Sequence, residues 1–212
     1  MKLYIDLETS AMPLEQLQPI MPEFEPAGNL KDPDKIKASI ADKQAAWLDG
    51  AALKPTTGRV IAFSMAWGND EPQFFANNDE KAMLQALDYE IMSLIGQGGN
   101  CYGWNIMGFD LPFLCGRCAV HEIPAFKGYT SNFRGRWSWN ECFVDPMQIW
   151  AGPYNRSDGA SLKNVSFALG LGLKDGNGKG FAALLKSDPE AAKRYAIMDC
   201  NLLRGVVQKM GI

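Results

Sequence analysis

The chain has 212 residues, of which 47% are hydrophobic, and this is enough to bury a full core within one domain. Its formal net charge of −3 excludes a strongly basic protein that would bind duplex DNA through charge alone. No apolar run is long enough to span a membrane, and the N-terminus lacks a secretory signal. Five irregularly spaced cysteines suit a reducing compartment, so we expect a cytoplasmic protein.

The first part of the chain predicts a strand, a long insertion and a pair of strands. Residues 2–6 have the pattern of a strand with carboxylates at its C-terminal edge. Residues 12–57 are polar and rich in proline, with one helix predicted at 34–48. An insertion of this length in a small domain is usually functional or mobile. Residues 59–67 and 72–76 then predict two paired strands.

The rest of the chain alternates helices and strands. The predicted elements are a helix at 80–95, a strand at 101–104, a helix at 110–120, a strand at 143–145, a helix at 161–169 and a helix at 188–210. Asp188 and Pro189 are typical N-cap and first residues of the last helix. This order resembles the ribonuclease H-like α/β fold, a central mixed five-stranded sheet flanked by helices. We expect a single domain over residues 1–212, with the long insertion after its first strand.

Four carboxylates stand beside these elements in an order that favours a metal site. Asp6 and Glu8 are two residues apart, so on a continuous strand both side chains leave the same face. Asp110 begins one predicted helix and Asp199 lies in the last, among apolar neighbours that would bury them. Buried carboxylates are costly unless a cation compensates them, and carboxylate oxygens suit a hard divalent cation. Tyr195 precedes Asp199 by four residues, so it shares the same helix face and its hydroxyl could orient an attacking water.

Three segments carry a family resemblance. They are residues 4–9 (YIDLET), 105–110 (NIMGFD) and 195–199 (YAIMD). They resemble the Exo I, II and III motifs of the DEDD (DnaQ-like) exonuclease superfamily, in its tyrosine-bearing branch. The histidine-bearing branch would have His five residues before the last Asp, where this chain has Arg194. Residues 111–114 and 161–165 look most like the exonuclease domain of family B DNA polymerases. Because no polymerase palm follows, we expect a free-standing exonuclease of the kind associated with phage and bacterial replication or repair genes.

The resemblance implies a metal-dependent 3′–5′ exonuclease that removes nucleoside 5′-monophosphates from single-stranded DNA in replication, repair or recombination. It implies two Mg²⁺ or Mn²⁺ ions per site. Asp6, Glu8 and Asp199 would contact metal directly, and Asp110 would hold the second ion, often through water. Tyr195 completes the implied catalytic set, and a replication or repair protein is the implied kind of partner.

Substrate contacts are expected from a second set of residues. By the same resemblance, Asn105 and Phe109 line the path of the last nucleotides, Leu7 contacts the substrate, and Glu8 lies near the terminal 3′-hydroxyl. Lys179 lies in a glycine-rich stretch that fits neither the phosphate-loop nor the dinucleotide pattern. We therefore interpret that stretch as turns, with Lys179 as a contact to the substrate backbone.

Other functions are open at the level of sequence. The substrate could be RNA instead of DNA, because nothing in the sequence indicates whether a residue contacts the 2′-hydroxyl. A catalytically silent module that binds 3′ ends or a polymerase is a third hypothesis, although such modules usually lose carboxylates. Endonucleolytic cutting, as in other ribonuclease H-like enzymes, fits poorly with Tyr195. Residues 12–57 are interpreted either as a flap over the substrate or as solvated surface.

Two weaker patterns have ordinary interpretations. Cys115, Cys118, His121 and Cys142 can be drawn as a zinc site, but three ligands at three-residue steps drift around one helix, which favours buried cysteines. Residues 134–139 interleave arginine with tryptophan, as surfaces that bind single strands do. The same run is equally typical of an edge hairpin with its tryptophans in the core.

Overall fold

The chain forms two compact units. The computed structural model describes residues 1–130, 139–152, 161–173, 178 and 180–212. The first unit comprises Met1–Glu8 and Val60–Ile212, and the second comprises Thr9–Arg59. A single functional domain over residues 1–212 stays a prediction.

A five-stranded mixed sheet organises the first unit, in the order β3-β2-β1-β4-β5. The strands are β1 (Lys2–Ala11), β2 (Gly58–Trp67), β3 (Gln73–Ala76), β4 (Asn100–Tyr102) and β5 (Phe143–Val144). β1 pairs in parallel with β4, and β4 in parallel with β5, whereas β2 and β3 are antiparallel. The predicted α/β fold of the ribonuclease H-like type is therefore confirmed.

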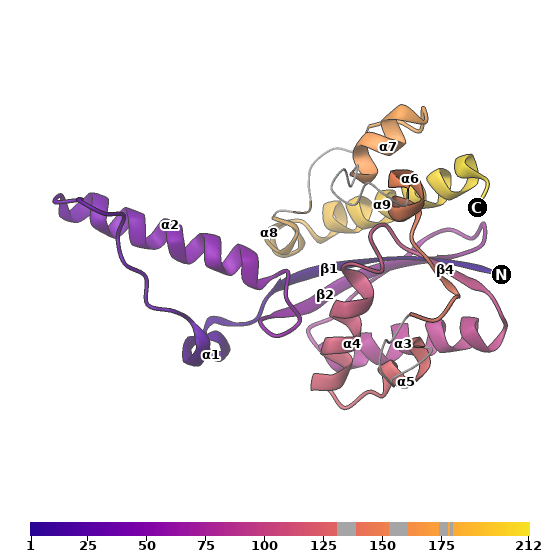
Figure 1. Ribbon diagram of the computed structural model, residues 1–212, viewed down its shortest axis with the longest axis horizontal. Coiled ribbons are helices and arrows are strands. Elements are labelled where there is room, and N and C mark those ends of the chain that lie inside the picture. The colour runs from indigo at the N-terminus through magenta and orange to yellow at the C-terminus, as the bar shows by residue number, and fades with distance from the viewer. Residues whose placement is uncertain (131–138, 153–160, 174–177, 179) are drawn as a thin grey trace. The chain divides into compact units, whose positions relative to one another are not determined.

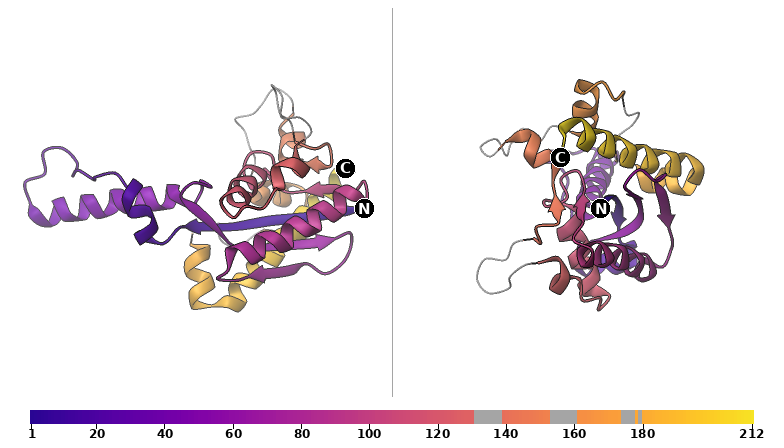
Figure 2. Two further views of the ribbon diagram at one scale, coloured as in Figure 1. Left: turned by 90° about the horizontal axis from the view of Figure 1, so that it is seen from below. Right: turned by 90° about the vertical axis from the view of Figure 1, so that its right-hand side faces the viewer.

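Helices cover both faces of this sheet (Figures 1 and 2). On one side lie α3 (Glu80–Gly96), α4 (Asp110–Val120) and α5 (Ala125–Tyr129), and on the other lie α6 (Pro146–Ala151), α7 (Leu162–Ala168), α8 (Phe181–Ser187) and α9 (Pro189–Met210). Successive side chains of β1 point to opposite faces of the sheet, so this strand contributes to the hydrophobic cluster on each face. Leu3, Ile5 and Leu7 join the cluster formed with α3 and α4, whereas Tyr4 packs with residues of α9.

The longest helices match the sequence predictions. Asp188 caps α9 by accepting a hydrogen bond from the Ala191 amide, and Pro189 opens the helix as predicted. Gly211 ends it in the left-handed conformation, at φ 70°. The short helices α5, α6 and α8 were not predicted. Each has five to seven residues, too few for a helical period to stand out.

Two strand boundaries were wrong: the strand expected at 101–104 ends at Tyr102, and the first strand is longer than expected. Residues 2–6 were expected to form the first strand, but β1 continues to Ala11. Asp6 and Glu8 therefore lie within the strand and not at its end. The alternation of Ile5 and Leu7 with these acids keeps a buried face beyond Asp6, which carries the strand past its expected end; residues 9–11 are only partly buried.

An ion-paired network ties α3 to α4. Glu80 is buried and accepts hydrogen bonds from the Arg117 guanidinium at 2.6 and 2.9 Å and from the Val60 amide at 2.8 Å. Its Oε2 atom also lies 2.9 Å from His121 Nε2. Burial by itself would raise the pKa of Glu80, but these hydrogen bonds outweigh it and lower the pKa.

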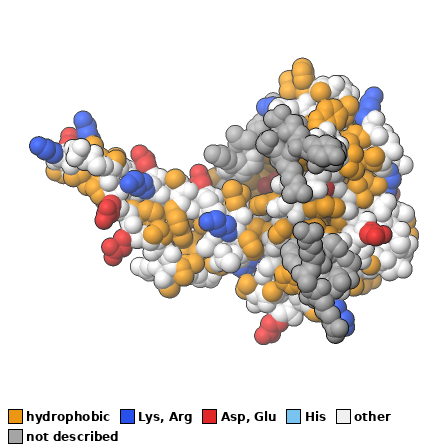
Figure 3. Space-filling model, viewed as in Figure 1, with side chains coloured by type: hydrophobic (Ala, Val, Ile, Leu, Met, Phe, Trp, Pro, Cys, Tyr) orange, Lys and Arg blue, Asp and Glu red, His pale blue; other side chains and the backbone are white. Residues whose placement is uncertain are grey.

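The second unit contains a long helix and a segment that packs along it. Its helices are α1 (Leu14–Leu17), the 3-10 turn η1 (Gln18–Ile20) and α2 (Pro33–Ala51), which extends the helix predicted at 34–48. Phe24 packs edge-on against Trp47, and Lys43 donates to the Glu25 carbonyl. Basic and acidic side chains are interspersed over α2 (Figure 3). The Met12 amide donates to the Thr57 carbonyl at 2.9 Å, so the two ends of residues 12–57 lie side by side.

In the part of the chain that the structure describes, no helix is both long and apolar enough to cross a membrane. All five cysteines are buried free thiols.

Candidate metal centre

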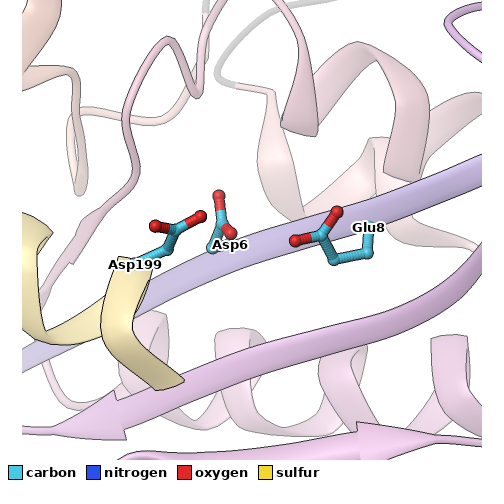
Figure 4. Close-up of side chains that lie close together, drawn as sticks. All are labelled: Asp6, Glu8 and Asp199. Atoms are coloured by element: carbon cyan, nitrogen blue, oxygen red, sulfur yellow. The ribbon is translucent and has the colours of Figure 1, made fainter. Parts of the chain in front are cut away.

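Three carboxylates from two elements meet beside the middle of the sheet. One carboxylate oxygen each from Asp6, Glu8 and Asp199 lies within 4.8 Å of the other two. Figure 4 shows Asp6 and Glu8 leaving β1 on the same side and Asp199 approaching from α9. Glu8 and Asp199 are buried, and Asp6 is partly buried. The structure therefore brings the acids of the first motif, Asp6 and Glu8, together with Asp199 of the third.

The position of α9 accounts for the approach of Asp199. Ala192 and Ala196 are fully buried against Ile61 and Ala62 of β2, so small side chains let the helix lie close to the sheet. Further along, Cys200, Leu203 and Val207 pack on Tyr4 and Tyr102. Asp199 lies between these two contacts, on the part of α9 that faces β1.

Asp110 lies next to this group but outside the three-oxygen set. It begins α4 and is buried, and its Oδ1 atom accepts a hydrogen bond from the Leu7 amide at 3.2 Å. Burial, and then the negative charge of Asp6, raise the pKa of Asp110 well above its usual value, against the effect of the Leu7 hydrogen bond. A cation near these groups would offset both effects.

The donor set fits a hard divalent cation. Mg²⁺ and Mn²⁺ prefer carboxylate and water oxygens, and Mg²⁺ binds them at about 2.0–2.1 Å. Oxygens on neighbouring octahedral positions are then roughly 3 Å apart and opposite ones roughly 4 Å apart, so a set spanning 4.8 Å needs only small side-chain adjustments. The acidic cluster could therefore bind a divalent metal, with water completing its coordination.

The alternative zinc site does not form among the described residues, where the three acids are the group with suitable geometry. His121 contacts Glu80, and burial raises the pKa of the Cys115 and Cys118 thiols to about 12. These cysteines belong to the core, as the helical spacing favoured.

One pocket of about 370 Å³ gathers the predicted site residues. Of these, Asp6, Leu7, Glu8, Asn105, Phe109, Asp110, Tyr195 and Asp199 line it, and Lys179 lies outside the described residues. Leu7 and Phe109 also belong to or pack on the main core cluster. The pocket therefore combines acids with apolar walls.

Tyr195 lies one turn before Asp199, as its spacing predicted. Its ring packs against Phe181 with centroids 5.8 Å apart, which holds the side chain at the pocket wall. A Cβ atom on Gly178 would lie 4.0 Å from the tyrosine hydroxyl.

Four further residues line the pocket: Trp104, Met147, Ser161 and Gly178. Trp104 directly precedes the second motif, and Ser161 lies within the flanking segment 161–165, so both positions had a signal in the sequence. Gly178 adjoins Lys179 in the glycine-rich stretch that was interpreted as turns, whereas Met147 had no signal, because α6 is too short to show a periodic pattern. Of the segment 134–139, only Trp139 is described, and it packs against the core.

Comparison with known proteins supports the fold. No family model matches the chain, and neither does any curated protein. Among solved structures, the chain is similar to the family B DNA polymerase from the hyperthermophilic archaeon Pyrobaculum calidifontis, with a TM-score of 0.63 and 14% sequence identity. The match covers 99% of this chain and 24% of the polymerase chain. At this identity the likeness establishes a shared fold, and the chain spans about a quarter of the polymerase's length.

Proposed function

We propose that this chain is a 3′–5′ exonuclease dependent on Mg²⁺ or Mn²⁺, which hydrolyses single-stranded DNA to nucleoside 5′-monophosphates in replication, repair or recombination. The observation that carries the proposal is the convergence of Asp6, Glu8 and Asp199 within 4.8 Å, beside Asp110 and in the pocket that Tyr195 lines. Similarity of fold to a family B DNA polymerase supports a function on nucleic acid.

The carboxylates would hold the cations. Asp6, Glu8 and Asp199 are the proposed direct ligands, and Asp110 is the proposed ligand of a second ion, often through water. When bound, such ions make water nucleophilic at neutral pH and stabilise the charge on the attacking and leaving oxygens. The tyrosine-bearing form of the motifs supports assignment to the tyrosine-bearing branch of the DEDD superfamily.

The chain's own residues would place the reactants. Leu7, Asn105 and Phe109 would hold the last nucleotides, with Glu8 near the terminal 3′-hydroxyl. The Tyr195 hydroxyl would orient the water that attacks the last phosphodiester. The new bond joins the water oxygen to phosphorus, and the bond to the 3′-oxygen of the preceding nucleotide breaks. A nucleoside 5′-monophosphate leaves, and the shortened strand keeps a 3′-hydroxyl.

A labelled single strand tests the proposal. The protein is incubated with 5′-labelled single-stranded DNA and Mg²⁺ or Mn²⁺, beside an EDTA control and the Asp6→Ala variant. Glu71→Ala, which removes an exposed carboxylate outside the pocket, is the matched control. We expect a ladder that shortens from the 3′ end with wild type and Glu71→Ala, and intact DNA in the other two reactions. Full activity of Asp6→Ala would overturn the assignment.

The same assay separates the alternatives. A matched RNA strand that is degraded faster than DNA would identify an exoribonuclease of the same fold. Intact DNA and RNA, combined with binding of Mn²⁺ measured by calorimetry, would identify a silent module that binds nucleic acid. Cutting of circular DNA would instead identify an endonuclease.

A further inference from the structure

Asp145 is a buried carboxylate that links three segments of the chain. It follows β5 directly, is 2% exposed and caps α6. Its Oδ1 atom accepts hydrogen bonds from the amides of Asn105 and Met147, both at 3.1 Å. Its Oδ2 atom accepts one from the Met107 amide at 3.3 Å. Helix capping accounts only for the Met147 contact, because an N-cap residue needs one or two amides of its own helix.

The other two contacts hold the loop that leads into α4. Asn105 has a left-handed backbone with φ 60°, a conformation that non-glycine residues adopt only when their surroundings favour it. Its carbonyl accepts from the amides of Gly108 and Phe109 at 3.0 and 2.9 Å, which closes a tight turn. Both amides that Asp145 binds in this loop lie within this turn, at Asn105 and Met107.

Gly108 leaves room for the Asn105 side chain. A Cβ atom at this position would lie 2.4 Å from the Asn105 side-chain oxygen, so the carboxamide lies directly over the glycine. The orientation of Asn105 is therefore fixed from two sides, by Asp145 through its backbone and by Gly108 beneath its side chain. Asn105 and Phe109, at the two ends of the turn, both line the pocket.

We infer that Asp145 is a positioning residue: by binding the amides of Asn105 and Met107 it sets the turn that presents Asn105 and Phe109 to the 3′-terminal nucleotide. This inference rests on the proposed function. Asp145 neither lines the pocket nor belongs to the three-acid cluster, so its proposed effect passes through the turn.

The variant Asp145→Asn removes one of the two loop contacts and keeps the Met147 contact of the helix cap. The amide oxygen can still accept from Asn105 and Met147, but the amide nitrogen cannot accept from Met107. We expect kcat/KM on single-stranded DNA to fall by about tenfold to hundredfold, with a rise in KM, because the terminal nucleotide is held less well. A protein that is merely less folded would instead have a smaller active fraction, with lower kcat and unchanged KM. The matched control is Asp79→Asn at the cap of α3, which leaves the pocket intact and should keep wild-type kinetics.

A double variant tests whether Asp145 acts through the turn. In an Asn105→Ala background, Asp145→Asn should cost much less than it does in the wild-type chain, because the positioned group is absent. Gly108→Ala, which displaces the Asn105 carboxamide without touching Asp145, should reproduce the rise in KM. Equal costs of Asp145→Asn in both backgrounds, or wild-type kinetics for Asp145→Asn, would overturn the inference.

Hydrogen exchange supplies a readout that does not depend on activity. The amide proton of Met107, which loses its acceptor, should exchange faster in Asp145→Asn than in Asp79→Asn. If the wild-type protein leaves DNA intact, the proposed function fails and the positioning role fails with it, while the exchange data still report whether Asp145 holds the turn. If wild type is active and exchange at the Met107 amide is unchanged, the positioning role alone is overturned.

Discussion

The Leu7 amide donates a hydrogen bond to Asp110 Oδ1 at 3.2 Å, and this bond joins the first and second carboxylate motifs through the backbone of β1. Because Leu7 lies between Asp6 and Glu8 in the strand, the bond holds Asp110 beside both acids. The same arrangement places a buried acid next to a second acid, which is unfavourable until a cation arrives.

Asp110→Asn should therefore make the metal-free protein more stable and less active. The raised pKa of Asp110 means that its ionised form costs stability at neutral pH, and this cost falls as the pH falls. Asparagine keeps the acceptor for Leu7 and removes the charge. We expect the Tm in EDTA at pH 7 to rise by roughly 2–4 °C, the shift that about 1 kcal/mol gives in a chain of this size.

Added Mn²⁺ should raise the Tm of wild type more than that of Asp110→Asn, and hydrolysis by the variant should be abolished. Differential scanning calorimetry with and without Mn²⁺ provides both Tm values. A lower Tm for the variant in EDTA would contradict the cost assigned to the buried charge.

Tyr195→Phe should lower kcat and leave KM nearly unchanged. The ring would still pack on Phe181, so only the hydroxyl that is proposed to orient the water is lost. We expect kcat on single-stranded DNA to fall by about tenfold to hundredfold. Tyr89→Phe, at a residue that is 72% exposed, is the control and should behave as wild type. Equal kcat values for the two variants would remove Tyr195 from the catalytic set.

Glu80→Gln should destabilise the fold in a pH-dependent way. It removes the charge of the carboxylate that pairs with the Arg117 guanidinium, whose side chain is 5% exposed, and we expect a loss of about 3–5 kcal/mol in the free energy of unfolding at pH 7. Because the pKa of Glu80 is lowered on folding, its ionised form contributes stability above about pH 4.5, and this contribution is lost as the pH falls through the folded-state pKa.

Urea unfolding of wild type and Glu80→Gln at several pH values measures this effect. The difference between the two proteins should be largest near neutral pH and should shrink below pH 4.5. Glu71→Gln, at an exposed acid, should match wild type throughout. A difference that is constant with pH would show that charge is not the source of the stabilisation.

Replacement of residues 13–56 by a short turn tests the insertion. The hydrogen bond from the Met12 amide to the Thr57 carbonyl shows that a few residues can join the two ends. If these residues act as a substrate flap, the shortened protein should bind single-stranded DNA more weakly, by fluorescence anisotropy, without a large change in Tm. Changing Lys31, just before α2, and Lys35 and Lys37 in its first turns to Gln tests whether this exposed charge is responsible. Unchanged affinity in both proteins would assign the insertion to solvated surface.

The sequence predicted the parts of the fold that have long periodic patterns. The strand pair at residues 59–67 and 72–76, the helix at 80–95 and the helix at 188–210 were confirmed as β2 and β3, α3 and α9. Their apolar residues recur over enough positions to fix both the type of element and the buried face. α5, α6 and α8 are too short to carry such a signal.

The candidate site was predicted by its motifs, and its supporting residues were not. Asp6, Glu8 and Asp199 stand in recognisable local patterns, so their convergence could be expected from the order of the elements. Asp145 had no such pattern, because its importance lies in amides 38 and 40 residues earlier in the chain. Contacts of this kind exist only once the strands and loops have been brought together.

The alternation along β1 means that one strand supplies both part of the hydrophobic core and two acids of the candidate site. The side chains of Leu3, Ile5 and Leu7 pack in the hydrophobic interior. Those of Asp6 and Glu8 leave the strand on the other face, where they meet Asp199. Insertion of a single residue before Asp6 would turn Asp6 and Glu8 toward the hydrophobic interior and Leu7 away from it, while Leu3 and Ile5 kept their places. The register of alternating residues along β1, more than any single side chain in it, is therefore what homologous proteins with the same site have to preserve.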